Sequence, residues 1–333
     1  MRNGFMTYDR NTIDSAGVFL IGELERLDQT MHEPLVSVMW GRDIDLREDV
    51  SIADEVSSFT LSNFASSGGI QTTGKSWIGK DTDQITGMSL DIGKTAHNLY
   101  LWGNELAYTI PELESSQRLG RPVDAQKYQA LQLKHQMDID EMVYIGDTLL
   151  DFPGLTNNDQ SPNGIVTNVA PVADTGTGSS TLWSAKTPDE ILADVNELLT
   201  SVWADSAWAL CPSRLLLPPT QFGFISSQKV SDAGNISIKK FLEENSIALE
   251  VNGRALEIYP SKWLVGRGVP VDDAATDRMM AYTKDKMRVR FPLVPLQRTP
   301  LEYRSIKHIT TYFGRLGVLE VVYPETIGYR DGI

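Results

Sequence analysis

The sequence has little of several residues on which many protein classes depend. Its 333 residues include one cysteine and four histidines. The single cysteine, Cys211, excludes an internal disulfide and fits a reducing compartment, and its apolar neighbours predict a small buried side chain. The histidines stand far apart without local ligand partners, which argues against a zinc site. No window approaches 18 uninterrupted apolar residues, so we expect no membrane-spanning segment.

Positive charge is also scarce. The chain has 30 Lys and Arg residues against 44 Asp and Glu residues, a formal net charge of −14, which excludes a protein that wraps nucleic acid tightly. Residues 284–333 are the exception, with nine basic residues against five acidic ones. Four basic residues alternate there and would share one face of a strand: Lys284, Lys286, Arg288 and Arg290. Two interpretations stay open, a solvated edge strand guarded by charge or a contact with an acidic neighbour.

A long helix is the strongest structural signal. Apolar or aromatic side chains recur at steps of three and four through residues 123–145, without an interrupting glycine or proline. Gly146 can then stop the helix in a left-handed conformation. The rest of the helix surface is polar, and a heptad pattern fails after two repeats. We therefore predict that this helix is the spine of an elongated domain.

The segments before this helix predict an arm and an extended loop. Residues 1–50 have no strong period and indicate an extended arm with a short helix at 16–27. Residues 51–110 contain strand-like runs on either side of a polar, glycine-rich tip. Such a loop has little core of its own, so we expect contacts outside its domain to stabilise it.

The remaining pattern mixes helices and strands, which predicts an α+β fold. A short helix is expected at 111–120, and Thr187 followed by Pro188 indicates a helix start. A short buried strand is expected at 215–217 and a helix at 236–245. Asn252-Gly253 predicts a hairpin within 246–259, and most of the residues after 278 are expected to form strands.

The motifs that could carry chemistry are incomplete. Residues 69–76 match the phosphate-loop pattern, but the helix that this motif requires does not follow Ser76. A nucleotide hydrolase that uses these residues therefore stays a weaker alternative to a loop tip. Residues 159–164 imitate a calcium loop, yet the twelfth position is Ala170 where a bidentate glutamate is needed. We expect a turn there.

No catalytic group stands out in the sequence. Asp138 and Asp140 face different sides of the predicted helix, so they do not form an acid–base dyad, and we interpret them as part of a solvated face. The nucleophile elbow of the hydrolases is absent. We therefore expect a protein that is not an enzyme and that has no cofactor or metal site.

The order of parts, together with local motifs, resembles the major capsid proteins of tailed phages with the Hong Kong 97 fold. The approach to the long helix, residues 107–124, and its exit through Val143-Tyr-Ile-Gly-Asp and Pro153-Gly-Leu-Thr-Asn are similar to that family. The last residues, 315–324 and 329–333, resemble the terminal strands of one capsid subgroup. The resemblance covers roughly residues 50–333.

The resemblance implies a division of the chain and a function. It implies an N-terminal arm, 1–50, an extended loop over a neighbouring subunit, 51–110, and a peripheral domain with the spine helix, 111–186. An axial domain, 187–283, and terminal strands returning to both domains, 284–333, complete it. The implied function is a major capsid protein that self-assembles from pentamers and hexamers into an icosahedral head enclosing double-stranded DNA. An encapsulin-type nanocompartment shell protein is the alternative.

The resemblance also implies partners and interface residues. A portal and possible scaffold or decoration proteins would bind the shell, DNA would be contacted non-specifically, and no membrane would be involved. The protein would assemble in the bacterial host cytoplasm and reside in the virion. We expect the loop tip to contact another subunit through Lys75, Trp77, Ile78 and Lys80, beside the basic row at 284–290. Some relatives crosslink through a loop lysine, but no matching acceptor is recognisable here.

Overall fold

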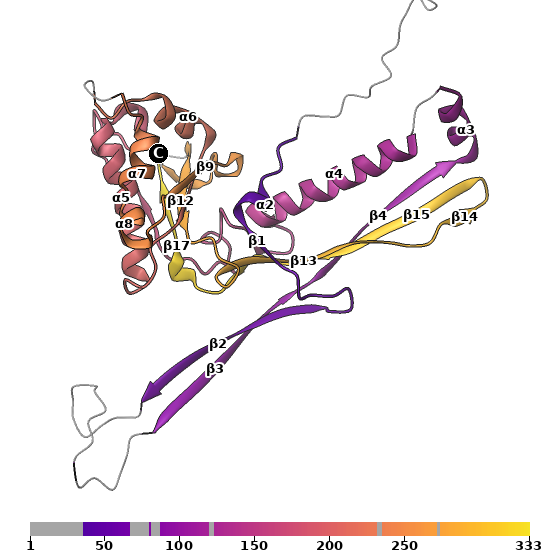
Figure 1. Ribbon diagram of the computed structural model, residues 1–333, viewed down its shortest axis with the longest axis horizontal. Coiled ribbons are helices and arrows are strands. Elements are labelled where there is room, and N and C mark those ends of the chain that lie inside the picture. Colours follow the sequence, from indigo (N-terminus) through magenta and orange to yellow (C-terminus); the bar gives the residue numbers. More distant parts are fainter. Residues whose placement is uncertain (1–35, 67–79, 81–86, 120–122, 232–234, 272–273) are drawn as a thin grey trace, which may run out of the picture.

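A long helix lies along an extended β-sheet, and a β-ribbon projects from the same body (Figure 1). The computed structural model describes residues 36–66, 80, 87–119, 123–231, 235–271 and 274–333. Helix α4 spans Val123–Tyr144, which confirms the predicted spine helix. Four of its buried side chains follow the predicted stripe: Leu131, His135, Ile139 and Val143. Gly146 has a φ of 76°, a backbone conformation that favours glycine.

The sheet beside α4 has six strands. Its order is β1 (Asp45–Arg47), β13 (Val289–Arg298), β15 (Lys307–Leu316) and β14 (Glu302–Arg304), with β16 (Glu320–Val321) beside β13 and β4 (Tyr100–Thr109) beside β15. Helix α4 packs on this sheet through an edge-on contact of His135 with Trp102, 4.7 Å between ring centres. Helix α3 (Ile110–Leu119) precedes α4, as predicted.

The ribbon consists of two antiparallel strands, β2 (Val56–Ser66) and β3 (Met88–Asn98). It extends away from the rest of the molecule (Figure 1). Within residues 51–110, these two strands form the projection, whereas β4 pairs along its length with β15. Of the glycine-rich tip between β2 and β3, only Lys80 and Gly87 belong to the described residues. Lys80 is exposed and lies in a turn.

A second lobe surrounds a five-stranded sheet. The strand order is β7 (Val169–Pro171), β17 (Ile327–Asp331), β12 (Arg278–Tyr282), β8 (Arg214–Leu217) and β9 (Glu257–Pro260). The helices of this lobe are α5 (Pro188–Asp205), α6 (Pro219–Ser227), α7 (Ile238–Asn245) and α8 (Ile247–Asn252). Helix α5 starts after Thr187, as predicted, and a capping box joins Thr187 to Glu190.

Two apolar cores hold these parts together. One lies in the second lobe between its helices and its sheet, around Leu198 and Leu215. The other lies where the end of α4 meets β12, β13 and β17, around Ile139 and Phe291. Short elements complete the chain: α2 (Trp40–Asp43), β5 (Gly146–Asp147), β6 (Phe152–Pro153), β10 (Gly268–Val271), β11 (Ala274–Thr276) and the 3₁₀ turns Trp183–Ala185, Lys262–Leu264 and Pro324–Thr326.

The predicted hairpin around Asn252 and Gly253 is wrong. Residues 247–252 form helix α8, and Gly253 ends it with a φ of 66° and a backbone bond of 2.9 Å from its N–H to the Leu249 carbonyl. The following strand pairs in parallel with β8 instead of turning back on α8. A left-handed glycine serves a helix C-cap as well as a hairpin turn. Burial of Ala248 in the core of the second lobe favours the helix here.

The interpretation of Asp140 as a solvated residue is also wrong. Its carboxylate is buried and accepts the backbone N–H groups of Met39, at 2.8 Å, and Trp40, at 3.0 Å. It also accepts the indole N–H of Trp263 at 2.7 Å. Asp140 thus fastens the first described residues of the chain to α4. The short helix predicted at 16–27 lies outside the described residues.

The predictions for Cys211 and for the calcium-like loop have structural counterparts. Cys211 is buried, as predicted, and burial raises the pKa of its thiol to about 11. Asp159, at the start of the calcium-like loop, lies in a turn and pairs with Arg278. Across the described ranges, no cluster of three or more His, Cys, Asp or Glu side chains could hold a metal ion. No helix of the described chain combines the length and apolarity that a membrane crossing requires.

Acid is expected to weaken the packing of α4 on its sheet. Burial lowers the pKa of His135, against the opposing effect of nearby Asp138, and the His135 Nε2 atom has no hydrogen-bond partner among the described residues. The unfolded chain therefore binds this proton more readily, and stability falls as pH drops below about 6.5. The loss is about 1.4 kcal/mol for each unit by which the folded pKa is lowered.

Urea unfolding at about pH 7.5 and about pH 5.5, on either side of the ordinary histidine pKa, measures this loss. The His135→Leu variant is the control, because it removes the titrating group and fills the same apolar space. Its stability is expected to fall less on acidification than that of the unchanged protein. An equal fall in both proteins would show that His135 does not carry the acid sensitivity.

Candidate subunit interface

One face of the ribbon carries an exposed apolar stripe. In the antiparallel register Phe64 pairs with Leu90, and the neighbouring rungs place Met88 and Ile92 on the same face. The exposed fractions of Phe64, Met88, Leu90 and Ile92 are 75%, 73%, 62% and 61%. We call these four residues the ribbon stripe. A contiguous apolar patch on a projecting element marks an interaction surface.

The opposite face of the ribbon packs on the body near its root. Phe59 and Leu61 line a cavity of about 230 Å³ together with Leu319 and Val321 from the region of β16. The ring of His97 lies 6.1 Å from that of Phe59. Burial lowers the pKa of His97, although nearby Glu320 acts in the opposite direction. The two faces therefore differ, since one contacts its own chain and the other presents the ribbon stripe.

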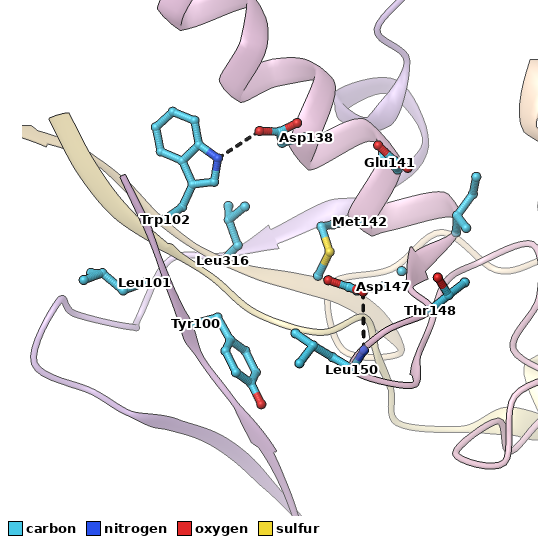
Figure 2. A pocket seen from close by; sticks show the side chains of 12 residues that line it. Tyr100, Leu101, Trp102, Asp138, Glu141, Met142, Asp147, Thr148, Leu150 and Leu316 are labelled. Atoms are coloured by element: carbon cyan, nitrogen blue, oxygen red, sulfur yellow. Dashed lines mark hydrogen bonds between the residues drawn. The ribbon is translucent and has the colours of Figure 1, made fainter. Parts of the chain in front are cut away.

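A groove of about 370 Å³ lies between β4, the end of α4 and the turn that follows it (Figure 2). Apolar side chains form much of its lining: Tyr100, Leu101, Trp102, Met142, Ile145, Leu150 and Leu316. Figure 2 shows three carboxylates around it, those of Asp138, Glu141 and Asp147. Asp138 accepts the indole N–H of Trp102 at 2.9 Å, and Asp147 accepts the backbone N–H of Leu150 at 3.4 Å. We call this site the acidic groove.

The prediction of a strand for the basic row, Lys284 to Arg290, is wrong. Residues 283–288 form a loop with a turn at 286–288, and β13 begins only at Val289. Asp285 organises the turn, because its carbonyl accepts the Arg288 N–H at 2.9 Å and its carboxylate accepts the Met287 N–H at 3.0 Å. The four basic side chains therefore do not project from one strand face.

Three members of the row are paired within the chain. Lys284 lies 3.5 Å from the Asp45 carboxylate, Arg288 lies 2.8 Å from Asp285, and Arg290 lies 2.6 Å from Glu320. Lys286 is exposed beside Met287, of which 75% is exposed. The turn at 286–288 thus offers a neighbour a smaller surface than the sequence pattern indicated.

The loop-tip residues are only partly described. Lys75, Trp77 and Ile78 lie outside the described residues, as does the phosphate-loop match at 69–76. Lys80 is exposed. The interface role of these residues stays a prediction.

Sequence reasoning missed the ribbon stripe. The alternation of Met88, Leu90 and Ile92 predicts a strand, and alternation alone places such residues on one common face. It does not say whether that face is buried. The antiparallel register with Phe64 and the projection of the ribbon beyond the body were needed to show that it is exposed.

Comparisons with known proteins agree with this architecture. The model of the family described as "Major capsid protein" matches residues 74–333. No curated protein matches the chain. Among solved structures, the capsid of Myoviridae phage XM1 is similar with a TM-score of 0.70 and 17% identity, covering 94% of this chain and 98% of that chain.

Two further structures share the fold. The capsid of the native GTA particle has a TM-score of 0.59 and 12% identity, covering 93% of this chain and 96% of that one. A structure from Mycobacterium phage Adephagia has a TM-score of 0.56 and 10% identity, covering 97% of both chains. These likenesses confirm the predicted Hong Kong 97-like capsid fold. Because the family model matches well over half of its length, the chain belongs to the major capsid protein family and is a structural protein of a viral head shell.

Proposed function

We propose that this protein forms pentamers and hexamers that close into the icosahedral head of a tailed bacteriophage around double-stranded DNA. Assembly would take place in the bacterial host cytoplasm. The observation that carries the proposal is the ribbon stripe, whose four large apolar side chains are 61% to 75% exposed. In a shell of many copies, a neighbouring copy lies within reach of each ribbon and can bury the stripe. The protein acts by association, without a catalytic step.

The acidic groove is the proposed receiving site for the loop tip of a second copy. The tip sequence places the apolar pair Trp77 and Ile78 between Lys75 and Lys80. The groove offers the complementary arrangement, an apolar lining beside three carboxylates. Trp is favoured at the energetic centre of interfaces, and charge complementarity at the rim selects the partner and its orientation.

The turn at 286–288 is a further proposed contact between copies, through exposed Lys286 and Met287. A portal, and scaffold or decoration proteins where the phage encodes them, would bind the assembled shell. Contact with DNA would be non-specific and weak for each copy, because the chain carries a net charge of −14. Nuclease-protected DNA inside particles from infected cells would separate this function from that of an encapsulin-type compartment.

Removing the apolar pair at the tip is expected to prevent shell closure without unfolding the chain. In the Trp77→Ser/Ile78→Ser variant, loss of a tryptophan anchor costs about 2 kcal/mol or more at each contact. That is more than tenfold in the association constant. Negative-stain electron microscopy of the purified protein measures closed shells, and a circular dichroism melt measures folding.

The matched control changes two residues of the same loop, Gln71→Ser and Thr72→Ser, and leaves the Trp–Ile pair intact. We expect normal shells from the control and a folded, soluble monomer or small oligomer from the test variant. Closed shells in normal yield from the Trp77→Ser/Ile78→Ser protein would contradict the anchoring role of the tip.

A further inference from the structure

A single arginine ties together the two chain segments at the root of the ribbon. Arg315, on β15, donates from Nε to the Ile52 carbonyl at 2.8 Å and from Nη1 to the Leu99 carbonyl at 3.1 Å. Ile52 precedes β2 and Leu99 follows β3, so the two carbonyls belong to opposite sides of the root. One rigid guanidinium therefore fixes both segments relative to the six-stranded sheet.

A second charged group holds the first rungs of the ribbon. Arg47, on β1, donates from Nη1 to the Ser57 hydroxyl and to the Ser58 carbonyl, both at 3.0 Å. The same guanidinium lies 3.2 Å from the carboxylate of Glu320 on β16. Glu320 is fully buried and also accepts the Arg290 Nε–H at 2.6 Å. The start of β2 is thus tied to the body through a buried, paired carboxylate.

Apolar contacts also hold the root. Leu99 is buried beside Gly317, and Phe59 and Leu61 lie against the body one or two rungs further out. Beyond these residues the strands are exposed on both faces, apart from side chains at the outer end that are not described. Apolar contacts are non-directional, whereas a satisfied network of charged hydrogen bonds defines one geometry. The arginines therefore define the direction of the ribbon more sharply than these apolar contacts do.

We propose that Arg315, together with the Arg47–Glu320 pair, is the positioning group that sets the angle at which the ribbon leaves the body. Its consequence for shell assembly rests on the proposed function, because a neighbouring copy can receive the ribbon only where the ribbon points. Arg315 acts through Ile52 and Leu99 and does not itself contact the neighbour. Its loss releases the ribbon from one orientation while the two cores of the body stay intact.

Distance measurement between spin labels tests the positioning directly. Cysteines replace Ser62 on β2 and the exposed Leu149 in the turn after α4, and buried Cys211 is left in place. Pulsed dipolar spectroscopy on the unassembled chain reports the distribution of label separations. We expect Arg315→Met to broaden this distribution about twofold, because the two hydrogen bonds of Arg315 no longer restrict movement of the ribbon at its root. The exposed Arg254, replaced by methionine, is the control for loss of a positive charge.

Arg315→Lys keeps the proposal testable if the methionine variant does not fold. A lysine retains the charge, but its compact ammonium lacks the planar fork that holds two separate carbonyls. We expect a folded chain, a broadened distribution and at least about tenfold fewer closed shells.

Two results would overturn the proposal. One is a folded Arg315 variant whose distribution of label separations is as narrow as that of the Arg254→Met control. The other is a broadened distribution with an undiminished yield of shells, which would remove the positioning role in assembly. If the unchanged chain itself formed no shells, the proposed function would fail, while the label distances would still decide whether Arg315 directs the ribbon.

Discussion

The Arg278→Met variant is expected to lose about 3–5 kcal/mol of folding free energy, because two buried carboxylates lose their partner. Arg278 is fully buried. It donates from Nε to Asp331 at 2.7 Å, from Nη2 to Asp159 at 2.9 Å and from Nη1 to the Thr156 carbonyl at 3.0 Å. Its guanidinium also stacks 4.7 Å from the centre of the Tyr329 ring.

The position of Arg278 explains why this loss should affect the whole chain. The loop at 155–159 is bonded to the end of α4, since the Leu155 N–H donates to the Val143 carbonyl at 2.8 Å. Arg278 joins that loop to β12 and β17 of the second lobe. A loss of this size is a large part of the stability of a typical domain, about 5–15 kcal/mol.

Urea unfolding followed by circular dichroism measures the effect. Arg254→Met is the control, because Arg254 is exposed and its removal is expected to change stability by less than about 0.5 kcal/mol. A triple variant that adds Asp159→Asn and Asp331→Asn should recover part of the loss, since no unpaired charge then remains buried. If Arg278→Met unfolds at the same urea concentration as the control, the buried cluster does not hold the lobes together.

Introducing a charge into the ribbon stripe is expected to abolish closed shells. In Leu90→Lys an ammonium group replaces an apolar side chain that is 62% exposed in the single chain. Folding should change by less than about 0.5 kcal/mol, because the position is solvated before assembly. In the shell the same lysine would be buried without a partner, and an unpaired buried charge costs several kcal/mol.

The matched control is Asn63→Lys. Asn63 lies on β2 directly before Phe64, which is the cross-strand partner of Leu90. Asn63 pairs with Asp91 on the opposite face of the ribbon and is exposed. Both variants add the same charge to the same element, on opposite faces of the ribbon. We expect shells from Asn63→Lys and folded, unassembled protein from Leu90→Lys by negative-stain microscopy. Equal shell yields would mean that the stripe face is not an interface.

The sequence predicted those elements whose signals are local. Helix α4 follows from a stripe that recurs every three to four residues, and α5 follows from the helix start at Thr187 and Pro188. The Asn252-Gly253 signal failed because a helix end and a hairpin turn both need a left-handed glycine. The choice between them was made by packing of α8 in the core of the second lobe, which the local sequence does not contain.

Polar residues were harder to place because their partners are distant in the chain. Asp140 is buried against Met39, Trp40 and Trp263, about a hundred or more residues away in either direction. The alternation from Lys284 to Arg290 imitates a strand, yet Asp285 within it favours a turn, which the pattern of basic residues concealed. The acidic groove likewise joins β4 to the end of α4, and no spacing in the sequence indicates that juxtaposition.

Electron cryo-microscopy of particles assembled from the purified chain tests the central claim most directly. The account predicts closed shells in which Phe64, Met88, Leu90 and Ile92, exposed in the single chain, are buried against a neighbouring copy. It also predicts that the tip residues Trp77 and Ile78 occupy the acidic groove of a second copy. Closed shells in which the ribbon stripe still faces solvent would contradict it.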